Sequence, residues 1–121
     1  MEQGRNPKRY DLEEGTYEFA SRVRAFIKRL KRTLGNIEDA RQLIRASGSV
    51  GANYIEANEA LGKKDFLMRI KICRKEAKES RLFLRPLDGD GDPEADNERQ
   101  HLIQEAQELT SIFGAIIRKS E

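Results

Sequence analysis

Two pairs of glutamates are the first residues in this sequence that could do chemistry. Glu56 with Glu59, and Glu76 with Glu79, are each spaced three apart on neighbouring helical segments. Paired carboxylates inside a four-helix bundle are the ligands of di-iron proteins, but those sites also need a Glu-x-x-His motif on two helices. The only histidine is His101. We therefore predict no metal site and no cofactor, and we expect these glutamates to be solvent-facing or ion-pair partners.

An aspartate-rich stretch, DGDGDPEADNER, resembles the opening of a calcium-binding loop. Asp88, Asp90 and Asp92 fall at its first, third and fifth positions, where such a loop carries ligands. The sixth position is Pro93 where a glycine is needed, and the twelfth is Arg99 where a bidentate glutamate should lie. The stretch is therefore expected to be an exposed acidic connection between helices.

Nucleophilic catalysis has no motif to support it. Cys73 lies on an apolar helical seam, where a thiol behaves as a small hydrophobe. Ser47, Ser49 and Ser80 have no base nearby in any known motif. We predict that the protein is not an enzyme. A single cysteine, the absence of a secretory signal and the absence of an apolar run of about 18 residues predict a cytoplasmic protein with no membrane segment.

Basic residues are concentrated on two segments. Residues 63–85 contain nine Lys and Arg against three Asp and Glu, whereas residues 86–121 contain three against nine. Like charges four apart on a helix repel by a few tenths of a kcal/mol, so a row of them favours a partner of opposite sign. That partner is either the acidic last segment or a phosphate backbone. The candidate nucleic-acid-binding residues are Arg24, Lys28, Arg32, Lys71, Arg74, Lys75, Lys78 and Arg81.

Apolar residues recur at alternating spacings of three and four throughout the chain, which predicts amphipathic helices. We place them at residues 12–34, 37–61, 64–85 and 96–118, after an N-terminal tail at 1–10. Short connections between helices of this length predict an all-α, antiparallel up-down-up-down four-helix bundle. The whole chain, 1–121, is expected to be a single domain.

Residue types at the ends of the segments predict where helices begin and stop. Asp11 is expected to cap the first helix, Gly35 to end it, and Asn36 to cap the second. The predicted buried seam of the second helix is Ile37, Ala40, Ile44, Ser47, Gly51, Tyr54, Asn58 and Leu61.

Two glycines, Gly48 and Gly51, lie inside the second predicted helix. Each costs roughly 1 kcal/mol of helix propensity relative to alanine, which suggests that another backbone packs closely against them. The apolar positions also outnumber those that one narrow core can use, so we expect self-association. The candidate close-packing or oligomer residues are Ser47, Gly48, Gly51, Ala52, Asn53, Tyr54 and Glu56.

Three stretches together resemble a known family: YDLEEGTYEFASRVRAFIKRL from Tyr10, GSVGANYIEANEA from Gly48 and DFLMRIKICRKEAKESR from Asp65. They are similar to the four-helix-bundle proteins encoded in intervening sequences of bacterial 23S ribosomal RNA genes. The resemblance implies a homopentameric ring, no catalytic residues and an association with RNA. The sequence departs from the expected pattern after Leu84, where Arg-Pro-Leu-Asp replaces a more apolar helix end.

Three functions remain open at this point. The first is a self-assembling protein that presents basic residues to RNA or a ribonucleoprotein. The second is a protein-binding scaffold, similar to the reverse-transcriptase accessory protein of diversity-generating retroelements, with no direct role on RNA. The third is a metal-dependent bundle enzyme. Salt-dependent RNA binding separates the first two, because phosphate contacts release counterions.

Overall fold

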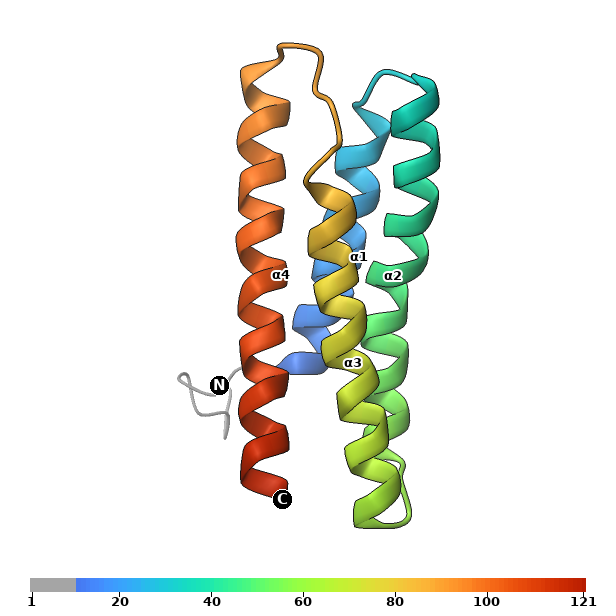
Figure 1. Cartoon of the computed structure of the whole chain (residues 1–121), viewed down its shortest axis with the longest axis vertical. Helices are drawn as coiled ribbons and strands as arrows, with labels where there is room; N and C mark the ends of the chain where they lie inside the picture. The colour runs from blue at the N-terminus through green and yellow to red at the C-terminus, as the bar shows by residue number, and fades with distance from the viewer. Residues whose placement is uncertain (1–10) are drawn as a thin grey trace, which may run out of the picture.

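The computed structural model describes residues 11–121 as four antiparallel helices (Figure 1). They are α1 (Leu12–Lys28), α2 (Leu34–Asn58), α3 (Lys63–Leu84) and α4 (Pro93–Ser120). No strand occurs within these residues. The predicted all-α bundle is confirmed, whereas the tail expected at 1–10 lies outside the described residues.

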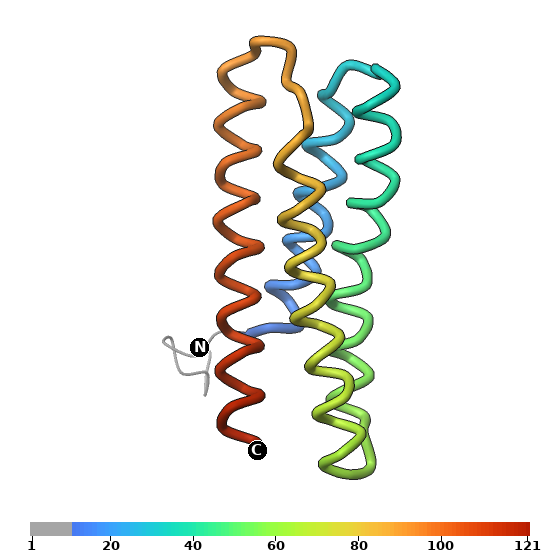
Figure 2. The backbone as a smooth tube through the Cα atoms, viewed as in Figure 1, coloured from blue at the N-terminus to red at the C-terminus, as the bar shows by residue number. Residues whose placement is uncertain are grey.

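Each helix packs only against its two neighbours in the bundle, so α1 lies diagonally across from α3, and α2 from α4. The contacts of α2 with α3 and of α3 with α4 are the most extensive, and those of α1 with α4 are the sparsest. Helix α1 is also the shortest. The backbone trace shows that it begins well above the C-terminal end of α4 (Figure 2).

The turn between α1 and α2 differs from the prediction. Helix α1 ends at Lys28 rather than near residue 34, and α2 begins at Leu34 rather than at 37. Gly35 therefore lies in the first turn of α2 and does not stop a helix. The N-cap is Thr33, whose hydroxyl accepts a 3.1 Å hydrogen bond from the backbone N–H of Asn36. Either side chain could cap a helix, and the buried amide of Asn36 has another use.

Asn36 ties together the two connections at the same end of the bundle. Its side-chain amide donates to the carbonyl oxygens of Lys31, at 3.0 Å, and Asp88, at 2.9 Å. Its side-chain oxygen accepts from the backbone N–H of Asp88 at 2.9 Å. The α1–α2 turn is thereby fastened to the α3–α4 loop, and the three bonds explain why a polar side chain is buried there.

Helix α4 begins at Pro93, three residues before its predicted start. Proline fits the first turn of a helix because its missing N–H would have no partner there. The carboxylate of Asp92 caps the helix by accepting from the backbone N–H of Glu94 at 3.0 Å. At the other end of the connection, α3 stops at Leu84, one residue short of the prediction.

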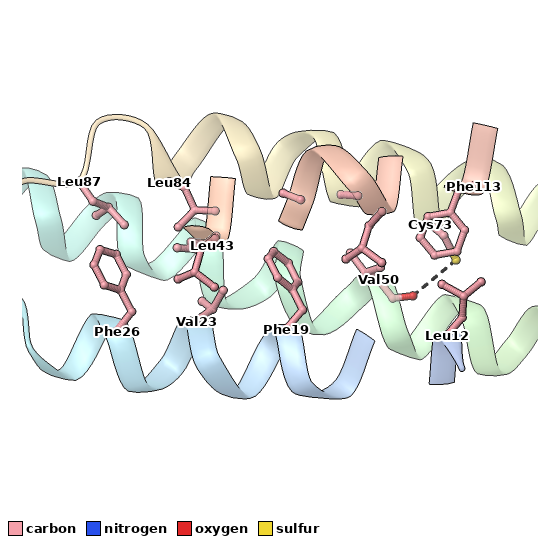
Figure 3. Packing of buried hydrophobic residues seen from close by; sticks show 14 of the residues in the cluster. Leu12, Phe19, Val23, Phe26, Leu43, Val50, Cys73, Leu84, Leu87 and Phe113 are labelled. Carbon is pink, nitrogen blue, oxygen red and sulfur yellow. Dashed lines mark hydrogen bonds between the residues drawn. The ribbon is translucent and has the colours of Figure 1, made fainter. Parts of the chain in front are cut away.

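The core lies along the apolar repeats of α1, α3 and α4. Phe19, Val23 and Phe26 point from α1 toward the other helices, and Phe113 enters from α4 (Figure 3). The seam of α2 is rotated from the prediction: Leu43 and Val50 are fully buried, whereas the predicted members Asn58 and Leu61 are exposed. The prediction placed Gly51 on the buried seam. Both Gly48 and Gly51 instead face α1 rather than the centre of the core.

Candidate nucleic-acid interface

Six basic residues, from Lys71 to the C-cap of α3 at Arg85, form one exposed face. Arg74, Lys78, Arg81 and Arg85 follow one another at spacings of four, three and four, which aligns them along the helix. Lys71 and Lys75 form the adjacent row, and all six side chains are exposed. We call these six residues the α3 basic face. From its first residue to its last it extends about 21 Å, because a helix rises 1.5 Å per residue.

Five of these six cations have no carboxylate within 4.0 Å anywhere in residues 11–121; the exception is Lys71, 3.8 Å from Glu121. The carboxylates on α3 itself point elsewhere. Glu79 lies 2.8 Å from Arg45 of α2, and Glu76 lies 3.5 Å from the same guanidinium. The α3 basic face therefore retains its charge.

Three acidic residues of α4 pair instead with arginines of α1 and its C-cap. Arg22 contacts Glu98 at 3.2 Å and Glu105 at 3.1 Å. Arg29 lies 3.3 Å from Glu94. The alternative in which helix four neutralises the row on helix three has only the contact at Lys71 in its favour.

The eight predicted nucleic-acid-binding residues fall into two separate groups. Lys71, Arg74, Lys75, Lys78 and Arg81 belong to the α3 basic face. The other three, Arg24, Lys28 and Arg32, lie on α1 and the turn that follows it. Helix α3 lies in front of α1 in Figure 1, and the two helices are diagonal in the bundle. The outward faces of the two groups therefore point in opposite directions.

The seven candidate oligomer residues are scattered as well. Ser47 is fully buried, and Tyr54 packs at the edge of the core against Phe113 with ring centroids 6.1 Å apart. Asn53 accepts a 3.0 Å hydrogen bond from Arg69 of α3. Glu56 is exposed and has no ion pair among the described residues.

The remaining three candidates, Gly48, Gly51 and Ala52, lie in a groove between α1 and α2. A Cβ on Gly51 would lie 3.0 Å from the hydroxyl oxygen of Thr16, so the close approach expected at this glycine is made by α1 of the same chain. A Cβ on Gly48 would meet only the end of the Arg24 side chain, at 3.6 Å. Gly51 thus needs no second copy to explain it.

The cysteine considered for catalysis and two of the aspartates considered for calcium binding make contacts within the fold. The Cys73 thiol donates to the backbone oxygen of Val50 at 3.5 Å, and burial raises its pKa to about 12 (Figure 3). Asp88 accepts from the backbone N–H of Asp90, and Asp90 pairs with Lys31 at 3.4 Å. Within residues 11–121 no three His, Cys, Asp or Glu side chains gather closely enough to hold a metal ion.

Sequence reasoning missed an acidic face between α1 and α4. Glu18, Glu98 and Glu108 lie near Glu105, and Arg22 contacts Glu98 and Glu105. Burial raises the pKa of Glu105, and the three neighbouring carboxylates raise it further, although Arg22 opposes them. The spacing of seven between Glu98 and Glu105 places both side chains on one face of their helix, but it does not show which neighbouring helix that face meets.

Comparison with solved structures shows similarity to a chain whose function is unknown. It is a protein of unknown function from the S23 ribosomal protein family of Bacteroides thetaiotaomicron. The sequences are 26% identical, the TM-score is 0.75, and the match covers 88% of this chain and 98% of the other. The chain is thus similar in fold and sequence to a member of that family.

No family model matches the sequence, and no curated protein matches it. None of the helices in residues 11–121 is both long and apolar enough to cross a bilayer.

Proposed function

We propose that this protein is a non-enzymatic, self-assembling four-helix bundle that binds RNA, alone or in a ribonucleoprotein, through the phosphates. The α3 basic face is the proposed contact. We also propose a cytoplasmic location, because a single buried and unpaired cysteine suits a reducing compartment. The family resemblance implies that this assembly is a homopentameric ring, like that of the proteins encoded in 23S ribosomal RNA intervening sequences.

One observation carries the RNA proposal: five adjacent exposed cations on α3 have no carboxylate partner in the part of the chain described. Their mutual repulsion is unfavourable in the isolated chain and becomes favourable beside a line of phosphates. The face contains no aromatic residue on which bases could stack, so the contact is expected to be insensitive to sequence. In an assembly each copy repeats the face, and weak contacts add by multivalency.

Charge reversal at Lys75 and Lys78 tests the proposal. Both side chains are exposed and form no ion pair within the described residues, so Lys75→Glu with Lys78→Glu should leave the fold intact. We expect this double variant to lose RNA binding while light scattering shows an unchanged assembly. The matched control is Lys75→Arg with Lys78→Arg, which keeps the charge and should keep the affinity.

A salt titration adds a second measurement. For single-stranded RNA the slope of log affinity against log salt is about 0.7 per phosphate contact. Neutralising both lysines with glutamine should therefore reduce the slope by about 1.4. An unchanged slope and affinity in both the reversed and the neutral variants would overturn the RNA proposal. Loss of the assembly in the reversed variant would instead show that the face is structural, as a protein-binding scaffold requires.

A further inference from the structure

We infer that copies of this chain associate head to tail, with the acidic α1–α4 face of one copy seated on the basic-rimmed apolar groove between α1 and α2 of the next. This inference rests on the self-assembly proposed above and assigns the surfaces that would meet.

The α1–α2 groove is apolar along most of its length. One end is a hollow of about 410 Å³ that includes Gly48, Gly51 and Ala52. Tyr17 and Ile55 flank this hollow, and their side chains are 65% and 48% exposed. Exposed apolar side chains beside a groove are typical of a protein contact.

The other end is a hollow of about 270 Å³. Its apolar walls come from Ile27 and Leu30 on the α1 side and from Ile37 and Ile44 on α2. Together the two hollows extend along most of α1, so the groove is long enough to receive a helix face rather than a single side chain.

The rim of this groove carries positive charge, of which Lys31 is paired with Asp90. Arg24, Arg32 and Arg41 line the groove, and Lys28 lies one helical turn after Arg24. These four side chains are exposed, and none lies within 4.0 Å of a carboxylate in the described part of the chain. The nearest polar partner of Arg24 is the backbone oxygen of Ala20, at 3.3 Å. An acidic occupant therefore suits the rim, although Glu13 lies at the far end of the groove.

The α1–α4 face has the opposite excess. It encloses an open hollow of about 870 Å³, lined on α1 by Glu18 and Arg22 and on α4 by Glu105, Glu108 and the apolar side chain of Ile112, among others. One arginine faces several carboxylates there, and burial with this crowding raises the pKa of Glu105. Cations from a second copy would relieve the crowding, and Ile112 would meet the apolar floor of the groove.

The two faces lie on adjacent sides of the bundle because both include α1. A contact between two different faces is heterologous, so each copy is turned relative to the one before, and such contacts generate a ring when the rotation closes. Helix α3 lies diagonally opposite α1 and stays outside this contact. The cations on α1 are thereby assigned to self-association and those on α3 to phosphate.

Complementary charge reversal tests the pairing. One variant carries Arg24→Glu and Lys28→Glu, and the other carries Glu18→Lys and Glu108→Lys; all four side chains are exposed. We expect each variant alone to scatter light as a folded monomer of 13.9 kDa. Mixing the two should restore association, because each variant keeps one native face and its reversed face complements that of the other. The Lys75→Glu, Lys78→Glu variant is the control and should assemble normally.

Other results would overturn the inference. Variants that remain assembled like the wild type would show that these faces do not meet, while the proposed self-assembly would still stand. A wild-type chain that is monomeric at micromolar concentration would remove both. If Arg24→Glu with Lys28→Glu loses RNA binding but keeps its assembly, the groove binds nucleic acid instead. Two monomeric variants that fail to associate when mixed would also refute the head-to-tail pairing.

Discussion

Alanine substitutions at the two groove glycines should have opposite effects on stability. Both glycines are in the interior of α2, where alanine is favoured by about 0.8–1.0 kcal/mol of helix propensity. At Gly48 the new Cβ would lie 3.6 Å from the end of the flexible Arg24 side chain, an ordinary contact. We therefore expect Gly48→Ala to raise the free energy of unfolding by up to about 1 kcal/mol.

At Gly51 the added carbon meets a side chain that cannot move aside. It would lie 3.0 Å from the Thr16 hydroxyl oxygen and 3.4 Å from the Thr16 Cβ. Thr16 is 1% exposed, and its hydroxyl donates to the backbone oxygen of Leu12 at 2.7 Å. Overpacking of this kind costs about 1–3 kcal/mol. Because the propensity gain is common to both variants, the difference between them should equal this overpacking cost.

Urea unfolding followed by circular dichroism measures the difference. The titrations should be run at two protein concentrations, because association adds to apparent stability. A double-mutant cycle identifies the cause: Thr16→Ala removes the hydroxyl, so Gly51→Ala should become favourable in that background. The reasoning is refuted if Gly51→Ala stabilises the wild type as much as Gly48→Ala does, or if Thr16→Ala leaves its effect unchanged.

Three further predictions concern individual side chains. Asn36→Ala should lower the free energy of unfolding by about 2–3 kcal/mol, because it leaves backbone groups of Asp88 without partners; a loss below about 0.5 kcal/mol would contradict this. Burial and neighbouring carboxylates raise the pKa of Glu105 in the folded chain above its ordinary 4.5. The protonated carboxyl therefore stabilises the fold fully below pH 4.5, and this stabilisation is lost as the pH rises through the pKa of the folded state. Glu105→Gln should therefore gain stability relative to the wild type across that interval, and a constant difference would refute the assignment. The Cys73 thiol, with a pKa of about 12, should react with iodoacetamide only as the chain unfolds, whereas rapid labelling of the native protein would show that it is accessible.

The helices and most of the core could be predicted because they depend on local periodicity. Phe19, Val23 and Phe26 recur at spacings of four and three, which one face of a helix must bury, and the structure buries them. The α2 seam was misplaced because alanines, serines and glycines in the middle of that helix give little hydrophobic contrast. A Gly or Ser on a helix fits a core, a seam or a groove equally well, and only the neighbouring helix decides among them.

Helix ends were predicted less well, since two residues could act as the cap. Thr33 and Asn36 both suit an N-cap. The side chain of Asn36 is buried without loss of hydrogen bonds because the backbone oxygen and N–H of Asp88, in a distant loop, bond to it. No pattern within the first forty residues contains that information, because the partner is 52 residues away in sequence.

The sequence by itself determined four amphipathic helices, their approximate order and lengths, and the residues that carry charge. Tertiary structure alone decided which charges meet. Arg22 of α1 and its C-cap Arg29 pair with glutamates of α4, and Arg45 pairs with the glutamates of α3. The cations left without carboxylate partners on α1 and on α3 lie on helices that are diagonal in the bundle. The physical reason is that side-chain periodicity within a helix is local, whereas the partner of a charge depends on which helix lies beside it and how each is rotated about its axis.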